Sequence, residues 1–296
     1  ESINELKLYK KILFDYLSFQ NISSLKLIKK TTLLVLYYLQ KWLCIFSLNK
    51  NEGKIINKGI IIHNRHSSGY FHWVLDVLPK ILYLKRFKDY SIILPINFKG
   101  SFQEKSIRMI SNIKIKYLNK KKTTIKSCIY ASELSASGTP RKEALLGIRK
   151  LYLSKIKKLK KIQKIYISRE NSSRRKLTNE KQFYEMLKKY KFKKYNMENF
   201  SFKKQIKISN SAKIIIGLHG AGLTNSIWME KGTTIIELKP EKNQYLNCYF
   251  SCSDIIRTKY KYFTCKKTNK LLTSRDSNYK VNISEFENEF KKDLLQ

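Results

Sequence analysis

Short apolar runs alternate with amphipathic segments in the second half of the chain, and this alternation restricts the fold more than any other feature of the sequence. Strands are predicted at residues 164–169, 192–198, 213–218 and 233–240, with helices at 179–190 and 201–212. Strands separated by helices are typical of a parallel sheet with right-handed crossovers. Ligands of such sheets bind at the carboxyl ends of the strands, where we expect Arg169, His219 and Glu237.

Three of the ten glycines fall within six residues of the stretch IIIGLHGAGLTN, at 214–225. The stretch predicts a strand, a tight turn and the start of a helix. Unpaired backbone N–H groups and the positive end of a helix dipole favour an anion such as phosphate, and glycine lets a ligand approach the backbone. The turn therefore either binds phosphate or needs glycine only for packing.

The first half has the same α/β rhythm from residue 54 onward, after a region rich in leucine, isoleucine and lysine. Thr31 to Leu48 is nearly long enough to span a bilayer, but Gln40 and Lys41 interrupt it. We expect a packed helix or helix pair there, with interfacial membrane contact as the alternative. The predicted parts are a helical N-terminal region at 1–50, α/β domains at 51–155 and 156–275, and a C-terminal helix at 276–296 that packs back on the amino-terminal domain.

The formal charge of +39 points to nucleic acid, an anionic membrane or an acidic ligand. Only ten of the 61 basic residues are arginine, whereas nucleic-acid binders more often use arginine for bidentate contacts. We therefore expect no nucleic-acid partner. Peripheral contact with an anionic membrane stays open, and so does a merely solvated basic surface.

Metal ligands are not evident in the sequence. His63, His66 and His72 crowd one ten-residue window near Asp76, but His72 and Asp76 fall on a predicted helix that the other two histidines precede. The five cysteines are odd in number and lack a paired C-x-x-C spacing, which favours reduced thiols in a cytoplasmic protein. We expect no metal site.

An arginine cluster follows the strand at 164–169. Arg169, Arg174 and Arg175 lie within seven residues, and Asn179 opens the next helix. Such a loop suits a diphosphate or carboxylate clamp, with a solvated basic loop as the alternative. Glu237 ends an apolar run and is a candidate acceptor for ribose hydroxyls.

Taken together, three segments resemble glycosyltransferase family 61. The first is Tyr70-Phe71-His72-Trp73 leading through Asp76 to Leu78-Pro79, and the second is Ile167-Ser168-Arg169 through Arg174 or Arg175 to Asn179-Glu180. The third runs from Gly217 to Pro240 and contains HGAGLTN, with Met229 and Gly232 in place. The resemblance covers roughly residues 55 to 285.

The resemblance implies a GT-B architecture, in which two Rossmann-like domains face a cleft. The domain at 51–155 would bind the acceptor, and the domain at 156–275 would hold a nucleotide sugar. Family members look like inverting enzymes that use UDP-sugars, commonly without a metal or other cofactor. The sequence is consistent with an enzyme that needs no metal. None of its six aspartates forms the Asp-x-Asp pair with which metal-dependent transferases hold a manganese-bound diphosphate.

The resemblance also assigns roles to individual residues. An inverting enzyme needs a base from the opposite domain, which points to Asp76 or His72, four residues apart on one helical face. We favour Asp76 as the base, with either one able to orient the other. The expected donor-binding residues are Arg169, Arg174, Asn179, His219, Gly220, Ala221, Gly222, Leu223, Thr224 and Glu237.

The expected function is transfer of a sugar from a UDP donor to a saccharide or lipid-linked saccharide during assembly of a cell-surface polysaccharide such as capsule or O-antigen. The expected location is the cytoplasm, with a peripheral position at the inner membrane face. A catalytically silent sugar- or nucleotide-binding protein is one alternative. A basic nucleic-acid-binding protein is the other.

Overall fold

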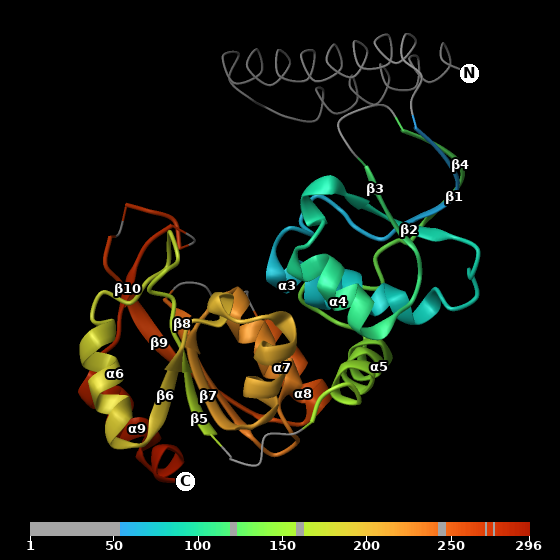
Figure 1. The fold of residues 1–296 in the computed structure, drawn as a ribbon. Coiled ribbons are helices and arrows are strands. Elements are labelled where there is room, and N and C mark those ends of the chain that lie inside the picture. The colour runs from blue at the N-terminus through green and yellow to red at the C-terminus, as the bar shows by residue number, and fades with distance from the viewer. Residues whose placement is uncertain (1–53, 119–122, 158–162, 242–246, 270, 275) are drawn as a thin grey trace, which may run out of the picture. The chain divides into compact units, whose positions relative to one another are not determined.

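We describe a computed structural model of the chain, which covers residues 54–118, 123–157, 163–241, 247–269, 271–274 and 276–296 (Figure 1). The predicted helical region at 1–50 and the Thr31 to Leu48 segment lie outside these residues. Contacts between Cα atoms group residues 55–296 into one compact unit. Within the described residues, no helix is both long and apolar enough to cross a lipid bilayer.

The first sheet of this unit has four strands in the order β3-β2-β1-β4. Strand β2 pairs in parallel with both β1 and β3, and Ile60 of β1 lies opposite Ile92 of β2. These strands are β1 (Lys54–Ile61), β2 (Ser91–Pro95), β3 (Ile115–Leu118) and β4 (Thr123–Tyr130). The helices of this part are α3 (Tyr70–His72), η1 (Trp73–Val77), η2 (Leu78–Tyr83), η3 (Ile96–Phe98), α4 (Phe102–Ile110) and α5 (Lys142–Leu153).

The second sheet has six strands in the order β10-β9-β8-β7-β5-β6, and all neighbours from β9 to β6 are parallel. Only β10 runs antiparallel to β9. Its strands are β5 (Gln163–Ile167), β6 (Phe192–Tyr195), β7 (Ala212–Leu218), β8 (Thr234–Pro240), β9 (Lys259–Lys267) and β10 (Tyr279–Lys280). Its helices are α6 (Glu180–Lys189), η4 (Met197–Asn199), α7 (Phe202–Asn210), η5 (Ala221–Trp228), α8 (Cys248–Ile256) and α9 (Ile283–Leu295).

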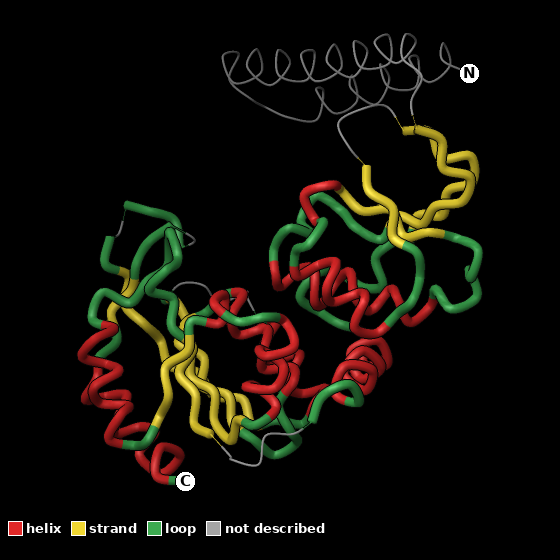
Figure 2. The backbone as a smooth tube through the Cα atoms, viewed as in Figure 1, coloured by secondary structure: helices red, strands yellow, loops and turns green. Residues whose placement is uncertain are grey.

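Helices cover both faces of the second sheet. Figure 1 shows α6 and α9 on one face and α7 and α8 on the other, and Figure 2 shows the same layers by type of structure. Alternate residues of each buried strand therefore serve two cores, as Ile214 and Ile215 of β7 do. The expected mixed α/β fold with parallel sheets is confirmed. The GT-B arrangement of two domains facing a cleft stays a prediction.

The C-terminal helix packs against a different part of the fold than we expected. We expected it to pack on the amino-terminal domain, but α9 packs on the second sheet instead. Its apolar residues Phe286 and Phe290 are four apart and face one side, and the Phe286 ring lies 5.0 Å from Phe183 of α6 and 5.3 Å from Phe263 of β9. This apolar stripe covers the face of the sheet that α6 alone would leave open.

Two predicted helices are also less regular than expected. The helix predicted to contain His72 and Asp76, expected as one amphipathic helix over residues 70–87, begins as α3, widens to a π-helical turn in η1 and tightens to a 3-10 helix in η2. Pro79 lies at the start of η2 and has no backbone N–H, so the α-helical ladder cannot continue through it. The helix after the glycine turn, η5, is likewise a 3-10 helix.

The cores of the two sheets join. Tyr152 of α5 packs between Phe202 of α7 and Trp228 of η5, at ring distances of 5.2 and 5.4 Å. The hydroxyl of Tyr70 in α3 donates to Asn225 Oδ1 of η5 at 2.7 Å. These contacts hold the segment that starts at Tyr70 against η5, which directly follows the glycine turn.

Candidate active site

The order of the second sheet defines where a ligand would bind. The chain passes from β5 to β6 on one side and then returns to β7 on the other side of β5. The carboxyl ends of β5 and β7 therefore form the topological switch point, where open α/β sheets bind ligands. Ile167 at the end of β5 pairs with Gly217 of β7, so Arg169 and the glycine turn leave the sheet side by side.

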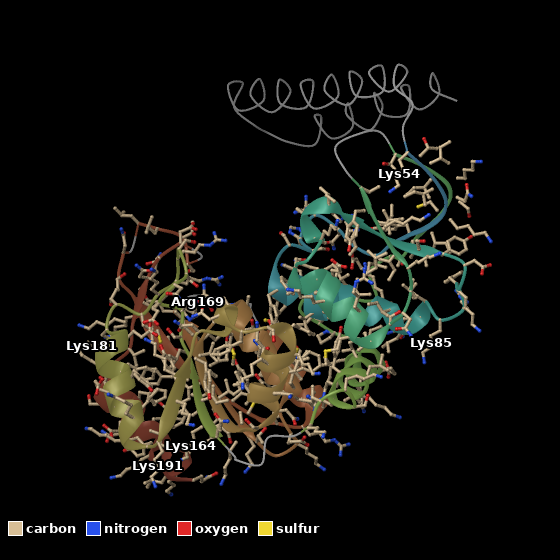
Figure 3. The ribbon with its side chains drawn as sticks, viewed as in Figure 1. Lys54, Lys85, Lys164, Arg169, Lys181 and Lys191 are labelled. Carbon is tan, nitrogen blue, oxygen red and sulfur yellow. The ribbon has the colours of Figure 1, made fainter. Side chains whose placement is uncertain are left out.

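Arg169, which is labelled in Figure 3, is fixed directly against the glycine turn. Its Nε donates to the Arg175 carbonyl at 3.0 Å and its Nη2 to the Arg174 carbonyl at 3.2 Å. The guanidinium lies so close to Gly220 that a Cβ atom there would be 2.1 Å from Nη1. Burial, followed by the charge of Arg175, lowers the pKa of Arg169 to about 10. Arg169 therefore places a cation at the switch point.

The glycines of the turn allow close packing against β5 as well as close approach of a ligand to the backbone. A Cβ on Gly222 would lie 2.9 Å from Ile167 Cγ2, so close contact with β5 requires glycine there. The first hydrogen bond of η5 runs from Leu223 N to Gly220 O. The amides of Ala221 and Gly222 precede it and have no acceptor within the helix, which leaves them for an anion. The side chains of Leu223 and Thr224 are buried, so these two expected donor-binding residues face the core.

His219 and Glu237 form a buried pair. Nδ1 of His219 hydrogen-bonds to Oε1 of Glu237, and the hydroxyl of Tyr260 donates to Oε2. The side chain of Glu237 has no exposed surface, against 8% for His219. Each oxygen of Glu237 already makes one hydrogen bond and the side chain is fully buried, so Glu237 does not face a ligand in this conformation, and its contact with ribose stays a prediction. Glu237 instead orients the His219 ring.

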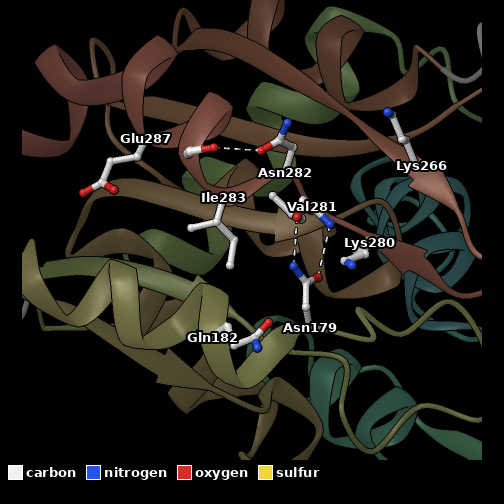
Figure 4. Close-up of a pocket in the computed structure, with 9 residues that line it drawn as sticks. Asn179, Gln182, Lys266, Lys280, Val281, Asn282, Ile283 and Glu287 are labelled. Carbon is white, nitrogen blue, oxygen red and sulfur yellow. Dashed lines mark hydrogen bonds between the residues drawn. The ribbon is translucent and has the colours of Figure 1, made fainter.

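Two further expected donor-binding residues have other contacts. Nη1 of Arg174 pairs with Asp276 Oδ1 at 3.2 Å on the surface, and its carbonyl holds Arg169. Asn179 is buried, and Figure 4 shows its amide bridging the backbone of Val281. Nδ2 donates to the Val281 carbonyl at 2.8 Å, and Oδ1 accepts from its N–H at 3.1 Å. Asn179 thus ties the start of α6 to the segment before α9.

His72 and Asp76 meet as their spacing predicted. Nδ1 of His72 and Oδ2 of Asp76 are 2.8 Å apart, and the hydroxyl of Ser137 donates to the same Oδ2 at 2.7 Å. The side chain of Asp76 is 10% exposed and that of His72 is 34% exposed. Of the residues that the structure describes, none hydrogen-bonds to Nε2 of His72. The imidazole therefore has one nitrogen held and one nitrogen open to a ligand.

Two aromatic residues connect this pair to the glycine turn. Phe71 packs edge-on against the His72 ring at 5.2 Å and against the Tyr249 ring at 6.0 Å. Tyr249 lies 5.4 Å from the His219 ring, and its hydroxyl donates to the Gly220 carbonyl at 2.6 Å. The candidate residues of both halves thus belong to one contiguous group of contacts.

Metal ligands do not gather here. Among the described residues, no group of three or more histidine, cysteine, aspartate or glutamate side chains is arranged to hold a metal ion. Cys248 and Cys252 lie on one face of α8 as free, buried thiols, and burial raises the pKa of Cys248 to about 12.

Sequence reasoning missed Ser137, Tyr249 and Tyr260. Ser137 lies in a loop without periodicity, and Tyr249 and Tyr260 reach the site from α8 and β9 across the fold. The alternation of lysine and tyrosine in KYKY, residues 259–262, is typical of a strand and could have predicted β9. The lysines made this segment look like a solvated loop.

A comparison with protein-family models matches residues 70–236 to glycosyltransferase 61. The match begins at Tyr70, and it includes the His72–Asp76 pair, Arg169 and the glycine turn. No curated protein matches the sequence. Because the match covers more than half of the chain, it shows the family. The chain belongs to glycosyltransferase family 61, and its activity is glycosyl transfer from a sugar donor to a saccharide acceptor.

Proposed function

We propose that the protein is an inverting glycosyltransferase that takes a sugar from a UDP donor without a metal ion. The observation that carries this proposal is the Arg169 guanidinium, fixed against the glycine turn at the switch point of the second sheet. A guanidinium and free helix-terminal amides are the groups that bind a diphosphate. Together they supply the positive charge that a divalent cation supplies in other transferases.

The diphosphate gains negative charge as the bond between the sugar and its phosphate oxygen breaks. Groups that are already in position stabilise this charge more in the transition state than in the bound substrate. Arg169 meets this condition because two backbone carbonyls hold it. His219 is also held, since its Nδ1 is fixed by Glu237.

We assign His72 as the base, and Asp76, which the sequence alone favoured for that role, as its positioning residue. Asp76 is only 10% exposed, and its Oδ2 already accepts from His72 and from Ser137, so its contacts hold the His72 ring in place. Nε2 of His72 is the more accessible acceptor. In this step the acceptor oxygen attacks the anomeric carbon and gives its proton to Nε2. The bond to the phosphate oxygen breaks on the opposite face, so UDP leaves with the bonding electrons and the configuration inverts.

Calorimetry with UDP tests the donor assignment. We expect UDP to bind wild-type protein equally well with and without EDTA, and Arg169→Ala to weaken binding. Binding of GDP or CMP in place of UDP, or a requirement for manganese, would overturn it. A screen of UDP-, GDP- and CMP-sugars for nucleotide release with acceptor fractions then identifies the donor sugar.

The cellular role that fits this chemistry is assembly of a cell-surface polysaccharide, such as capsule or O-antigen, from a saccharide or lipid-linked acceptor. We place the enzyme in the cytoplasm, held peripherally at the inner membrane face by its basic surface, on which Figure 3 labels Lys85, Lys181 and Lys191. Each lysine near an anionic surface contributes on the order of 1 kcal/mol, and salt screens it. Sedimentation with anionic liposomes should weaken steeply as salt rises, and salt-independent pelleting would contradict this attachment.

A further inference from the structure

A pocket of about 670 Å³ lies at the carboxyl end of β1, outside the donor-binding residues. It is lined by His63, Asn64, Arg65 and His66 from the loop after β1, and by Tyr130 from the end of β4. A pocket of this volume accommodates one or two sugar rings. None of the roles assigned above uses it.

The loop that lines the pocket is held in one conformation. Oδ1 of Asn64 accepts from the His66 N–H at 2.9 Å and from the Ser67 hydroxyl at 3.1 Å. Nδ2 of Asn64 donates to Glu133 Oε1 at 2.8 Å. Lys80 is almost completely buried and donates to the Ile62 carbonyl at 3.1 Å, so the start of the loop is anchored as well. The lining is therefore preorganised.

The charge of the pocket favours an anion. The carboxylate of Glu133, which accepts a hydrogen bond from Asn64 in the lining, is already neutralised, because its Oε2 lies 3.1 Å from Lys80 Nζ. Burial lowers the pKa of His63, so this side chain is neutral at pH 7 and the positive charge of the lining comes from Arg65. Arg65 donates its Nε to His66 Nε2 at 2.9 Å, and the described residues supply no carboxylate partner for its guanidinium. The exposed fork of Arg65 suits a carboxylate or a phosphate group.

The rest of the lining suits a sugar ring close to the proposed base. The Tyr130 side chain is 59% exposed, and an exposed aromatic ring offers an apolar platform with a polar edge. The His66 ring lies 5.2 Å from the His72 ring. A saccharide in this pocket therefore lies next to the residue that takes the acceptor proton.

We propose that this pocket is the acceptor subsite and that it selects a saccharide bearing a carboxylate or phosphate group. Arg65 binds the anionic group, and Tyr130 stacks on a sugar ring. This inference rests on the proposed function, since it gives His72 its acceptor.

Ligand-observed NMR titrations at constant ionic strength test the subsite with three probes: methyl glucuronide, glucose 6-phosphate and methyl glucoside. We expect at least one charged probe to bind at least about tenfold more tightly than the neutral one, as charge-assisted hydrogen bonds imply. Preference for methyl glucuronide identifies a uronic acid, and preference for glucose 6-phosphate identifies a sugar phosphate. Equal binding of all three probes, or no binding of either charged probe, overturns the proposal.

Variants assign the binding to the pocket. Arg65→Gln should abolish the preference for the charged probe, and Tyr130→Ala should weaken all three probes alike. Arg86→Gln is the matched control, because Arg86 is an exposed arginine that packs on Phe87 and is not among the residues that line the pocket. If Arg65→Gln and Arg86→Gln bind the probes equally, the charged probes bind the general basic surface and the proposal fails.

UDP calorimetry on the same samples separates this inference from the proposed function. If UDP binds and the saccharide preference is absent, only the acceptor subsite is wrong. If the saccharide preference is present and UDP does not bind, the pocket stands as a saccharide site and the donor assignment fails.

Discussion

Replacing Gly220 with alanine is expected to displace Arg169 and weaken UDP binding while the protein stays folded. The new Cβ would lie 2.1 Å from Nη1 of Arg169, whereas an ordinary contact begins at 3.4 Å. The guanidinium must therefore move by about 1.3 Å. The backbone of Gly220 is extended, with φ 164° and ψ 173°, which alanine also adopts, so the effect comes from this contact alone.

The expected loss follows from the bonds that hold Arg169. A shift of this size breaks its hydrogen bonds to the Arg174 and Arg175 carbonyls, which are 3.2 and 3.0 Å long. It also removes charge-assisted contact with the diphosphate, which contributes about 1.5 to 3 kcal/mol. The Kd for UDP should rise by roughly 10- to 150-fold.

A double-mutant cycle tests the mechanism as well as the size of the effect. Calorimetry should show that Gly220→Ala adds almost nothing in an Arg169→Ala background, because the side chain that it displaces is gone. Gly69→Ala is the control, since its Cβ would meet the His66 carbonyl at 3.4 Å and leave UDP binding unchanged. Additive losses in the double variant would refute displacement of Arg169 as the cause.

Four further variants test other assignments. His72→Ala should lower kcat by about 10²-fold or more and Asp76→Asn by less, both with unchanged UDP affinity, and the reverse order would exchange base and positioning residue. Glu237→Ala should lower the free energy of unfolding in urea by about 2 to 4 kcal/mol as well as weaken UDP binding, whereas a ribose anchor would affect only UDP. The N–H of Gly100 is the main cause that lowers the pKa of Glu104 to about 2. Glu104→Gln should therefore cost about 1 to 2 kcal/mol at pH 7, and this difference should shrink as pH falls below about 4.5 and vanish near pH 2; a constant difference in urea titrations would contradict it.

The sequence predicted the parts of the fold that periodicity controls. Strands β5, β7 and β8 are buried on both faces, so their apolar runs stand out. Strand β9 escaped prediction because only Phe263 and Cys265 face the core, while lysines and tyrosines occupy its other positions. The regular helix expected through Pro79 failed because a proline inside an amphipathic pattern changes the hydrogen bonding without changing the periodicity.

The candidate site was predictable where its contacts are local. The four-residue spacing of His72 and Asp76 was enough to predict their pairing. The role of Asn179 depends on Val281, and that of Glu237 depends on Tyr260, far along the chain. A sequence motif does not show which carboxylate or amide already hydrogen-bonds to another part of the protein. Only the folded structure therefore separates ligand-binding residues from the residues that support them.

In the proposed mechanism, Tyr249 gives the two substrates a means of affecting each other. Its hydroxyl bonds to the Gly220 carbonyl, and its ring touches Phe71, which packs on His72. A donor that orders the glycine turn thereby restrains the neighbourhood of the base, and an acceptor that restrains the base orders the turn. Binding linkage is reciprocal, so UDP should raise the affinity for the acceptor by the same factor by which the acceptor raises the affinity for UDP. Tyr249→Phe should bring that factor toward one.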